Sequence, residues 1–311
     1  MRHLPTLNVR DVHHLSKLLG TCPQELEKIC RDPKQHYRQG PRVIKGKIRD
    51  IATPQGRLRE ILDRLQGLLQ RVSLPNSIHG GRKGRSHFTN ALCHARKPAV
   101  FGTDVKKFFP SVAHHRVYKL FRLRLGCSPD AARYLTRLTT LNGCLPQGSP
   151  TSTILSALVS EHLAIRLEKL AAQHKATNTQ YVDDIDFSGP SHIVRLAPLV
   201  ETIIQQEGFE VNRSKSKIAN ANREQTVTGI RVNQGLDVTH KKMKEARTLL
   251  DDIKMRQENG ADLSQRELAS IKGKIRYIEG LNRGAGRFLQ RRLKSILFLK
   301  PTVESAIKIS G

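Results

Sequence analysis

The sequence contains no tryptophan, and other aromatic residues are scarce, with five tyrosines and nine phenylalanines among 311 residues. Proteins that hold single-stranded nucleic acid mainly by stacking its bases need aromatic side chains to stack on. This composition argues against binding dominated by base stacking. A nucleic acid would instead be held mainly through contacts with its backbone and its shape.

Cysteine patterns typical of metal sites or disulfides are also missing. The five cysteines are scattered without a CxxC pair, at positions 22, 30, 93, 127 and 144. A zinc site or a disulfide framework is therefore not expected, and the thiols should be reduced. No segment approaches the ~18 apolar residues of a membrane span, and no hydrophobic signal segment follows the N-terminus. We expect a cytoplasmic protein with no membrane partner.

Acidic residues are few relative to basic ones. The chain has 54 Lys and Arg against 27 Asp and Glu, which gives a net charge of +27. In the free protein these positive charges repel one another. When they neutralise the phosphates of a nucleic acid, the phosphates release their counterions, and this release favours binding. Nucleic acid is therefore the expected partner. The length allows two or three subdomains with substantial cores.

The spacing of apolar residues predicts a mixture of helices and short strands. The N-terminal third should contain helices at 7–31 and 58–69, a basic β-like segment at 37–49 that turns at Gly46, and a glycine-rich basic loop at 79–85 that contacts nucleic acid. Further along we expect a strand at 99–112, helices at 117–138, 154–170 and 193–206, and two strands within 180–187. A strand at 209–211, a hairpin at 227–238 that turns around 233–235, and basic helices from 239 should follow. This order is typical of an α+β fold with a largely antiparallel sheet.

Two adjacent acids, Asp183 and Asp184, interrupt the β-like segment 180–187. Flanking β-formers predict two short strands with the acids at the turn between them. Neighbouring side chains of a strand point to opposite faces, so both carboxylates reach one place only at a turn. Their repulsion becomes favourable around a divalent cation, which phosphoryl-transfer enzymes need. A solvated acidic turn is the alternative that this segment leaves open.

Asp104 is the best candidate for a third acid in such a site, because it follows an apolar strand that begins at Ala99. A capping or turn aspartate is the alternative. Asp104, Asp183 and Asp184 would be the catalytic residues, and two metal ions held there would activate a hydroxyl and stabilise leaving pyrophosphate. Asp184 has the less certain role as a ligand. Asp186 is expected to point to the opposite face from Asp184 and is assigned a structural role.

Five short motifs resemble those of reverse transcriptases and occur in the same order. Residues 181–184 (Tyr-Val-Asp-Asp) resemble the Tyr-x-Asp-Asp box, and Asp104 with Phe108 and Phe109 resembles the first palm motif. The other motifs are 145–148 (Leu-Pro-Gln-Gly), 46–49 (Gly-Lys-Ile-Arg) and 208–215. The resemblance implies an RNA-directed DNA polymerase, a nucleotidyltransferase that uses two Mg²⁺ ions or Mn²⁺ in their place.

The resemblance also implies a right-hand polymerase fold. An N-terminal helix and the fingers would occupy residues 1–98, and the palm residues 99–238. A helical, RNA-binding thumb would occupy residues 239–311. The thumb's phosphate contacts would come from arginines, any one of which alone is expected to be solvated: Arg276, Arg283, Arg287, Arg291 and Arg292.

Two further strings are similar to elements of retron reverse transcriptases. Residues 90–94 resemble the Asn-Ala-x-x-His element, and residues 227–229 resemble the Val-Thr-Gly element. In that subfamily both are associated with the cognate RNA and the DNA product. The residues to which the resemblance gives RNA or DNA binding are Asn90, His94, Val227, Thr228 and Gly229. A buried, hydrogen-bonded His94 is the alternative. One departure is Val182, where retron enzymes most often have alanine.

Nucleotide-binding roles follow from the same resemblance. Phe109 would exclude a ribose 2′-hydroxyl, and Gln147 with Gly148 would let the backbone approach the incoming nucleotide. Ordinary core packing for Phe109 and a simple turn at a helix start for Gln147 are the alternatives.

Basic residues would hold the phosphates of that nucleotide. Lys47 and Arg49 would grip the triphosphate, Arg49 through a bidentate fork. Lys215 would protonate or neutralise leaving pyrophosphate, with Lys217 as its competitor. A solvated surface is the alternative for Lys47.

The resemblance also implies partners. The enzyme would bind its own structured noncoding RNA as template and primer, and copy part of it from dNTPs into single-stranded DNA. Priming from the 2′-hydroxyl of a guanosine would give a branched RNA–DNA hybrid. A role in phage defence would involve a separately encoded effector, and RNase H would come from the host. The alternatives are a stand-alone group II-like bacterial reverse transcriptase, and a ribonucleoprotein scaffold that chiefly holds an effector.

Overall fold

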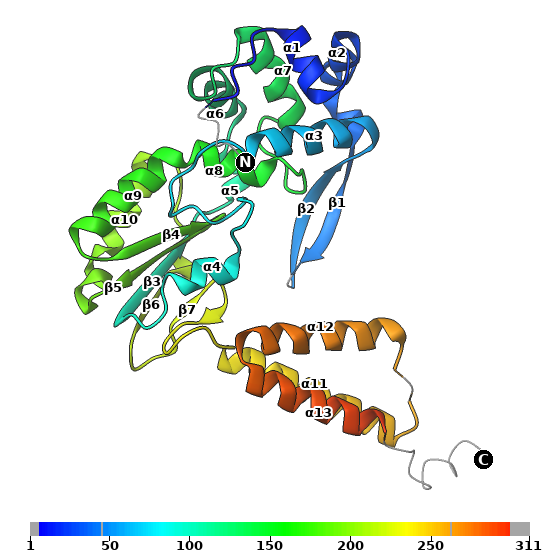
Figure 1. Cartoon of the computed structure of the whole chain (residues 1–311), viewed down its shortest axis with the longest axis vertical. Helices are drawn as coiled ribbons and strands as arrows, with labels where there is room; N and C mark the ends of the chain where they lie inside the picture. The colour runs from blue at the N-terminus through cyan, green and yellow to red at the C-terminus, as the bar shows by residue number, and fades with distance from the viewer. Residues whose placement is uncertain (1–5, 45, 262, 299–311) are drawn as a thin grey trace.

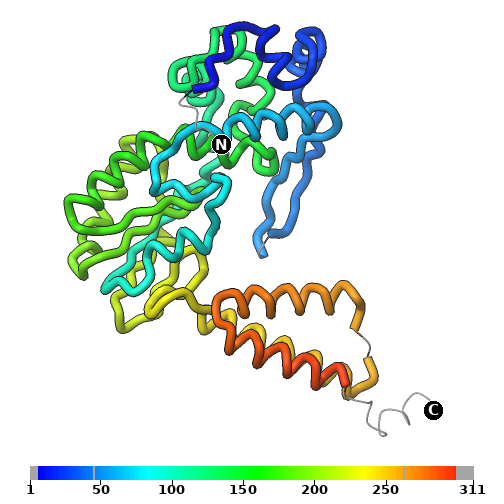
Figure 2. The backbone as a smooth tube through the Cα atoms, in the orientation of Figure 1, coloured from blue at the N-terminus to red at the C-terminus, as the bar shows by residue number. Residues whose placement is uncertain are grey.

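The computed structural model describes residues 6–44, 46–261 and 263–298. These residues form three parts arranged as an open C (Figures 1 and 2). Helices and a long hairpin of the N-terminal part lie at the top. A sheet with helices on one side occupies the centre, and three C-terminal helices extend from its lower end (Figure 1). None of the helices in the described ranges is long and apolar enough to cross a membrane.

The N-terminal part follows the predicted pattern with one correction. The helix expected at 7–31 is two helices, α1 (Val12–Leu19) and α2 (Pro23–Arg31). Gly20 ends α1 in the left-handed conformation, with φ 63°, and proline is favoured where α2 begins. The β-like segment is a hairpin of β1 (Tyr37–Ile44) and β2 (Lys47–Pro54), after the short 3-10 helix η1 (Pro33–His36), and α3 (Gly56–Leu69) follows. The predicted turn at Gly46 is confirmed, with φ 73°.

The central part contains a four-stranded antiparallel sheet in the order β4-β5-β3-β6. Its strands are β3 (Ala99–Asp104), β4 (Thr177–Tyr181), β5 (Asp184–Gly189) and β6 (Lys217–Asn220). Phe101 on β3 and Phe187 on β5 are opposite each other in the register and stack at 4.9 Å between ring centres inside the main core. The predicted α+β class with an antiparallel sheet is confirmed.

The helices between residues 87 and 215 either pack near this sheet or, as α7 does with α1 and α2, against the N-terminal part. They are α4 (His87–Leu92), α5 (Phe108–Ser111), α6 (His114–Lys119), a π-helix (Leu120–Arg124), α7 (Pro129–Thr139), α8 (Ser152–Val159), α9 (Glu161–Gln173), η3 (Ser191–Leu196), α10 (Ala197–Gln206) and η4 (Arg213–Lys215). The helix expected at 154–170 is interrupted at Ser160, which separates α8 from α9.

Two strand predictions in this part are wrong, and a third needs an addition. The strand expected at 99–112 ends at Asp104, because Lys107 has a left-handed φ of 48° and α5 begins immediately after it. The segment 209–211 forms only an isolated bridge, between Val211 and Val105. The turn expected around 233–235 is present, because Arg231 and Asp237 exchange both backbone hydrogen bonds across it, each at 2.9 Å. A second and tighter hairpin precedes it, formed by β7 (Thr226–Val227) and β8 (Ile230–Arg231).

The C-terminal part is a three-helix unit of α11 (His240–Glu258), α12 (Gln265–Leu281) and α13 (Arg283–Leu297). It has its own apolar core, which includes Leu250, Ile275 and Leu289. The predicted domain limits fall between elements, at 98/99 before β3 and at 238/239 before α11, and they stay predictions. Residues 1–5 of the first predicted domain and 299–311 of the predicted thumb lie outside the described residues.

Candidate active site

The three predicted catalytic acids lie together at one end of the central sheet. Asp104 is the last residue of β3, Asp184 is the first of β5, and the two are opposite each other in the register. Tyr181 pairs with Asp184, so Val182 and Asp183 form a two-residue turn. Val182 has φ 60°, as such tight hairpin turns require. The backbone N–H of Val105 donates to the Asp183 carbonyl at 2.9 Å, which fixes the turn against β3.

Asp104 is buried and held on two sides. Lys215 Nζ donates to its Oδ2 at 2.5 Å, and Asn212 Nδ2 donates to its Oδ1 at 3.3 Å. The backbone N–H of Asn212 also donates to the Asp104 carbonyl at 2.7 Å. Lys215 therefore lies beside the acids in this structure. To act on leaving pyrophosphate as predicted, it would have to release Asp104 and contact the pyrophosphate instead.

The pKa of Asp183 is raised, as is expected of a carboxylate that shares a cation site with other carboxylates. Burial raises its pKa to about 6, and repulsion from Asp184 and then from Asp104 adds to the shift. A buried carboxylate whose ionisation is opposed by two neighbouring carboxylates belongs to a suitable donor set for a divalent cation. Within the described ranges, no three His, Cys, Asp or Glu side chains form a ready-made cage. Mg²⁺ does not need one, because it is bound by one or two carboxylates together with substrate phosphates and water.

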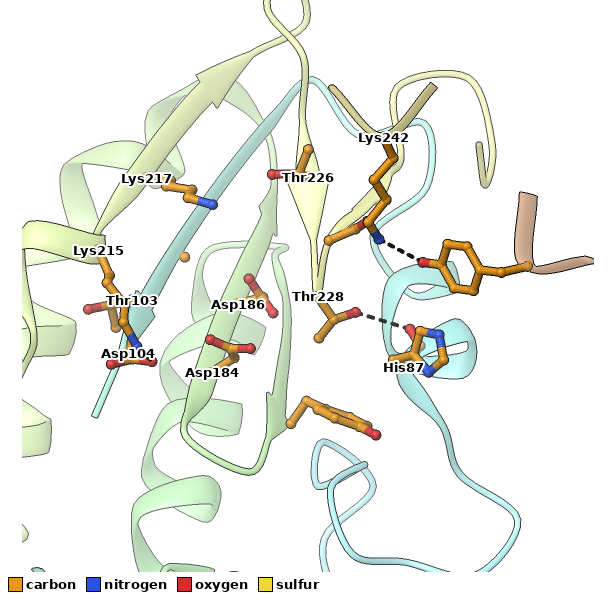
Figure 3. Close-up of a pocket in the computed structure, with 14 residues that line it drawn as sticks. His87, Thr103, Asp104, Asp184, Asp186, Lys215, Lys217, Thr226, Thr228 and Lys242 are labelled. Atoms are coloured by element: carbon orange, nitrogen blue, oxygen red, sulfur yellow. Dashed lines mark hydrogen bonds and ion pairs between the residues drawn. The ribbon is translucent and has the colours of Figure 1, made fainter. Parts of the chain in front are cut away.

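The prediction that Asp186 points to the opposite face from Asp184 is wrong. Residues two apart along a strand lie on one face, and both side chains line the same cavity (Figure 3). Asp186 is opposite Gly102, where a Cβ would lie 2.6 Å from its Oδ1. Burial and then the Asp184 charge raise the pKa of Asp186 to about 8, and Asn90 Nδ2 lies 3.5 Å from its Oδ2. Asp186 is thus a largely buried acid that is neutral at pH 7.

Replacing Asp186 with Asn should remove a pH-dependent loss of stability. The unfolded carboxyl has an ordinary pKa of 3.8, so between about pH 4 and 8 the folded state holds a proton that the unfolded state has released. Wild-type stability should therefore fall relative to Asp186→Asn as pH rises, by up to about 1 kcal/mol per pH unit. Urea unfolding at pH 5 and pH 8 in EDTA measures this difference. Parallel pH profiles for the two proteins would contradict it, and the exposed Asp130→Asn serves as control.

The acids face a cavity of about 710 Å³ (the acid cavity). One wall carries Asp104, Asp184 and Asp186, and the turn between β7 and β8 forms the other (Figure 3). Its remaining lining residues are His87, Gly102, Thr103, Tyr181, Lys215, Lys217, Thr226, Thr228, Gly229, Lys242 and Tyr277. No local motif marks His87, Lys242 and Tyr277, which reach the cavity only through the tertiary fold and were not predicted from sequence.

The predicted nucleotide-binding residues Gln147 and Gly148 lie against β2. The Ala52 N–H donates to the Gln147 carbonyl at 2.8 Å. Gly148 has φ 122°, and a Cβ there would lie 2.8 Å from Ile51 Cγ2. Glycine is therefore required where this loop passes the strand. Phe109 lies half-buried in α5, with its ring centre 6.1 Å from that of Phe108.

Lys47 and Arg49 lie near the tip of the β1–β2 hairpin and do not line the acid cavity. Lys47 is exposed, whereas Arg49 is partly buried and opposite Arg42. Their grip on a triphosphate stays a prediction, as do the roles of Phe109 and Gln147.

Two predicted RNA-binding residues, Asn90 and His94, are fully buried, and their association with RNA or DNA stays a prediction. His94 lies within hydrogen-bonding distance of two hydroxyls, with Nδ1 2.7 Å from Ser188 Oγ and Nε2 2.7 Å from Thr179 Oγ1. Burial lowers its pKa to about 3, so the ring is neutral. His94 is thus buried and hydrogen-bonded in this structure, and it ties the segment after α4 to β4 and β5.

The Val-Thr-Gly element is divided between core and cavity. Val227 is fully buried, whereas Thr228 and Gly229 line the acid cavity, and the predicted roles of all three at RNA or DNA stay predictions. Among the predicted thumb contacts, Arg292 forms an ion pair with Asp251. The others are exposed: Arg276, Arg283, Arg287 and Arg291. None of these arginines lines the acid cavity, and their roles stay predictions.

Comparison with known proteins agrees with this geometry. Residues 33–246 match the family model described as reverse transcriptase (RNA-dependent DNA polymerase). The chain therefore belongs to the reverse transcriptase family, and its polymerase fold is confirmed.

The relatives it resembles are retron reverse transcriptases. It is 32% identical to the Retron Mx65 reverse transcriptase of Myxococcus xanthus over 270 residues, which cover 80% of this chain and 62% of that protein. It is 29% identical to the Retron Ec86 reverse transcriptase of Escherichia coli over 264 residues, which cover 80% of this chain and 79% of that protein. The predicted resemblance is confirmed. The chain spans less than two thirds of the length of the Mx65 protein. It also spans only 63% of the length of another relative, the Retron Se72 reverse transcriptase of Salmonella heidelberg.

Among solved structures, telomerase from Candida albicans in complex with a TWJ fragment of telomeric RNA matches with a TM-score of 0.45 and 11% identity. The match covers 86% of this chain and 57% of that one.

Proposed function

We propose that the protein is a retron-type RNA-directed DNA polymerase. The observation that carries the proposal is the meeting of Asp104, Asp183 and Asp184 where β3 faces the β4–β5 hairpin, in a chain of the reverse transcriptase family. The raised pKa of Asp183 supports a shared cation there. The net charge of +27 supports a nucleic-acid template.

Members of this family generally use divalent metal ions. Asp104, Asp183 and Asp184 would hold two Mg²⁺ ions, or Mn²⁺ in their place, and the metal would supply Lewis-acid stabilisation of phosphate charge. The protein's own residues would position the reactants. Lys215 would neutralise phosphate charge beside Asp104, and Phe109 would select deoxyribose.

The resemblance to retron enzymes supports finer parts of the proposal. The protein would bind one structured noncoding RNA and copy part of it from dNTPs, starting at the 2′-hydroxyl of a guanosine. The product would be single-stranded DNA branched from RNA, trimmed by host RNase H in the cytoplasm. The complex would hold a separately encoded effector and act in phage defence.

Sequencing the nucleic acid that co-purifies with the full protein from its host tests the proposal. We expect one RNA species linked to single-stranded DNA, and RNA without DNA when Asp183 and Asp184 are both changed to Ala. Branched DNA in that double variant would overturn the catalytic assignment. Random cellular RNA, with activity on any primed template, would instead favour a group II-like enzyme. A specific RNA without DNA in the wild type would favour a scaffold.

A further inference from the structure

The three-helix unit contacts the central part in two places. One is the junction between the two parts, where Asn282 Nδ2 donates to Asp237 Oδ1 at 3.0 Å and Leu281 packs on the small core around Val227. The other lies at the acid cavity, where Lys242 of α11 and Tyr277 of α12 form part of the lining. The first contact joins the parts, and the second places two side chains of the three-helix unit in the candidate active site.

Lys242 connects α11, α12 and the turn between β7 and β8. Its Nζ donates to the Gly229 carbonyl at 2.7 Å and to the Tyr277 hydroxyl at 2.9 Å, and lies 4.6 Å from the centre of the Tyr277 ring. A Cβ at Gly229 would lie 3.3 Å from this ammonium, and Gly229 has φ 75°. The glycine therefore allows both the turn and the close approach of the lysine.

The same turn is held from its other side by α4. Thr228 Oγ1 donates to the His87 carbonyl at 3.1 Å (Figure 3). The His87 and Tyr277 rings are nearly parallel, 6.0 Å apart between centres, and the Phe88 ring lies 5.9 Å from Tyr277. In a chain with so few aromatic residues, these rings gather at one junction between α4 and α12.

The backbone of the turn is strained. Thr228 has φ 47°, a left-handed conformation that is unfavourable for a β-branched residue, at a cost of about 1–3 kcal/mol. Such a conformation persists only where the surroundings determine it. Here they do so through His87 on one side and Lys242 on the other.

The strained turn and the acids form opposite walls of one cavity (Figure 3). A primer end that reacts at Asp104 and Asp184 must lie between these walls. The position of the turn therefore sets how the primer end meets the acids. Small displacements of reacting groups have large kinetic effects, about 10²-fold for about 1 Å.

We propose that Lys242 is a positioning residue for the polymerase reaction. By tying the Thr228–Gly229 turn to α12 through Gly229 and Tyr277, it holds the primer end in register with the acids. This inference rests on the proposed function. It gives the three-helix unit a role in the chemical step beyond binding nucleic acid at its surface.

Single-turnover addition of one nucleotide to a DNA primer annealed on a synthetic RNA template tests the inference. Lys242→Met keeps the length of the side chain but removes both hydrogen bonds, and should slow addition about tenfold at saturating duplex and dNTP. Tyr277→Phe removes only one bond and should have a smaller effect. Because the two residues act as one unit, the double variant should be no slower than Lys242→Met.

Lys244→Met is the matched control, since it removes a positive charge from an exposed position of the same helix. A positioning role predicts that Lys242→Met melts no more than a few degrees below this control, because only two hydrogen bonds are lost, and that it binds duplex within about twofold of the control with the same salt dependence. Duplex binding that weakens while the addition rate holds would identify Lys242 as a phosphate contact and overturn the inference. An addition rate equal to that of the control would also overturn it. A wild-type protein that extends no primer would overturn the proposed function itself.

Discussion

Changing Asp183 to Asn is expected to lower the rate of primer extension by about 10³-fold or more without unfolding the protein. The substitution keeps the size of the side chain and removes the charge that a metal ion needs. It leaves the hairpin intact, because the turn is fixed by the Asp183 backbone carbonyl, which accepts from Val105 N–H. Single-turnover extension with Mg²⁺ present measures the loss.

Stability should not fall with activity in this variant. Burial and the neighbouring carboxylates raise the pKa of Asp183 to about 6, so its ionised form is unfavourable in the folded state at neutral pH. The neutral Asn relieves that repulsion, and urea unfolding in EDTA should show equal or greater stability than wild type. Asp130→Asn, an exposed acid on α7, controls for charge and should change neither property. If Asp183→Asn kept more than about a tenth of the wild-type rate, the assignment of the acids would be wrong.

The hairpin was predictable because its information is local. Alternating β-formers on both sides of Asp183 and Asp184 specify two strands and a two-residue turn, which the structure has. Assigning Asp104 to the same site required long-range information. Asp104 and Asp184 are about eighty residues apart in the sequence, and only the antiparallel register of β3 and β5 brings them opposite each other. The ordered motifs of a known family supplied that long-range information.

Other features were missed because tertiary contacts decide them. The strand after Asp104 stops where Lys107 adopts a positive φ that lysine does not favour. The tight turn between β7 and β8 requires the same of Thr228, so it was not predicted beside the turn around 233–235. The burial of His94 depends on hydroxyls of β4 and β5, far away in the sequence. Local patterns carry no signal for any of these.

Changing Gly80 to Ala should displace the turn of the β4–β5 hairpin, because Gly80 packs directly against the backbone of Val182. Residues 77–80 run beside β4, where the Gln180 N–H donates to the Ser77 carbonyl and the His79 N–H donates to the Gln180 carbonyl, both at 2.8 Å. A Cβ on Gly80 would lie 2.2 Å from the backbone nitrogen of Val182 and 3.0 Å from its Cα. Backbone atoms cannot move aside as the end of a flexible side chain can, so the turn that carries Asp183 must shift. The loop at 79–85, predicted from sequence only as a contact for nucleic acid, thus also supports the hairpin.

The expected result is a loss of about 2 kcal/mol in the free energy of unfolding and a fall of about 10²-fold in the rate of nucleotide addition. Gly67→Ala is the matched control, because Gly67 lies within α3 with open space around its Cβ position, and alanine there should be neutral or stabilising. Loss of stability with a normal rate would show that the segment supports the fold but does not set the position of Asp183. Normal values of both would mean that residues 77–80 separate from β4 at little cost. A slow but stable variant would show most directly that the support behind Val182 keeps Asp183 in place.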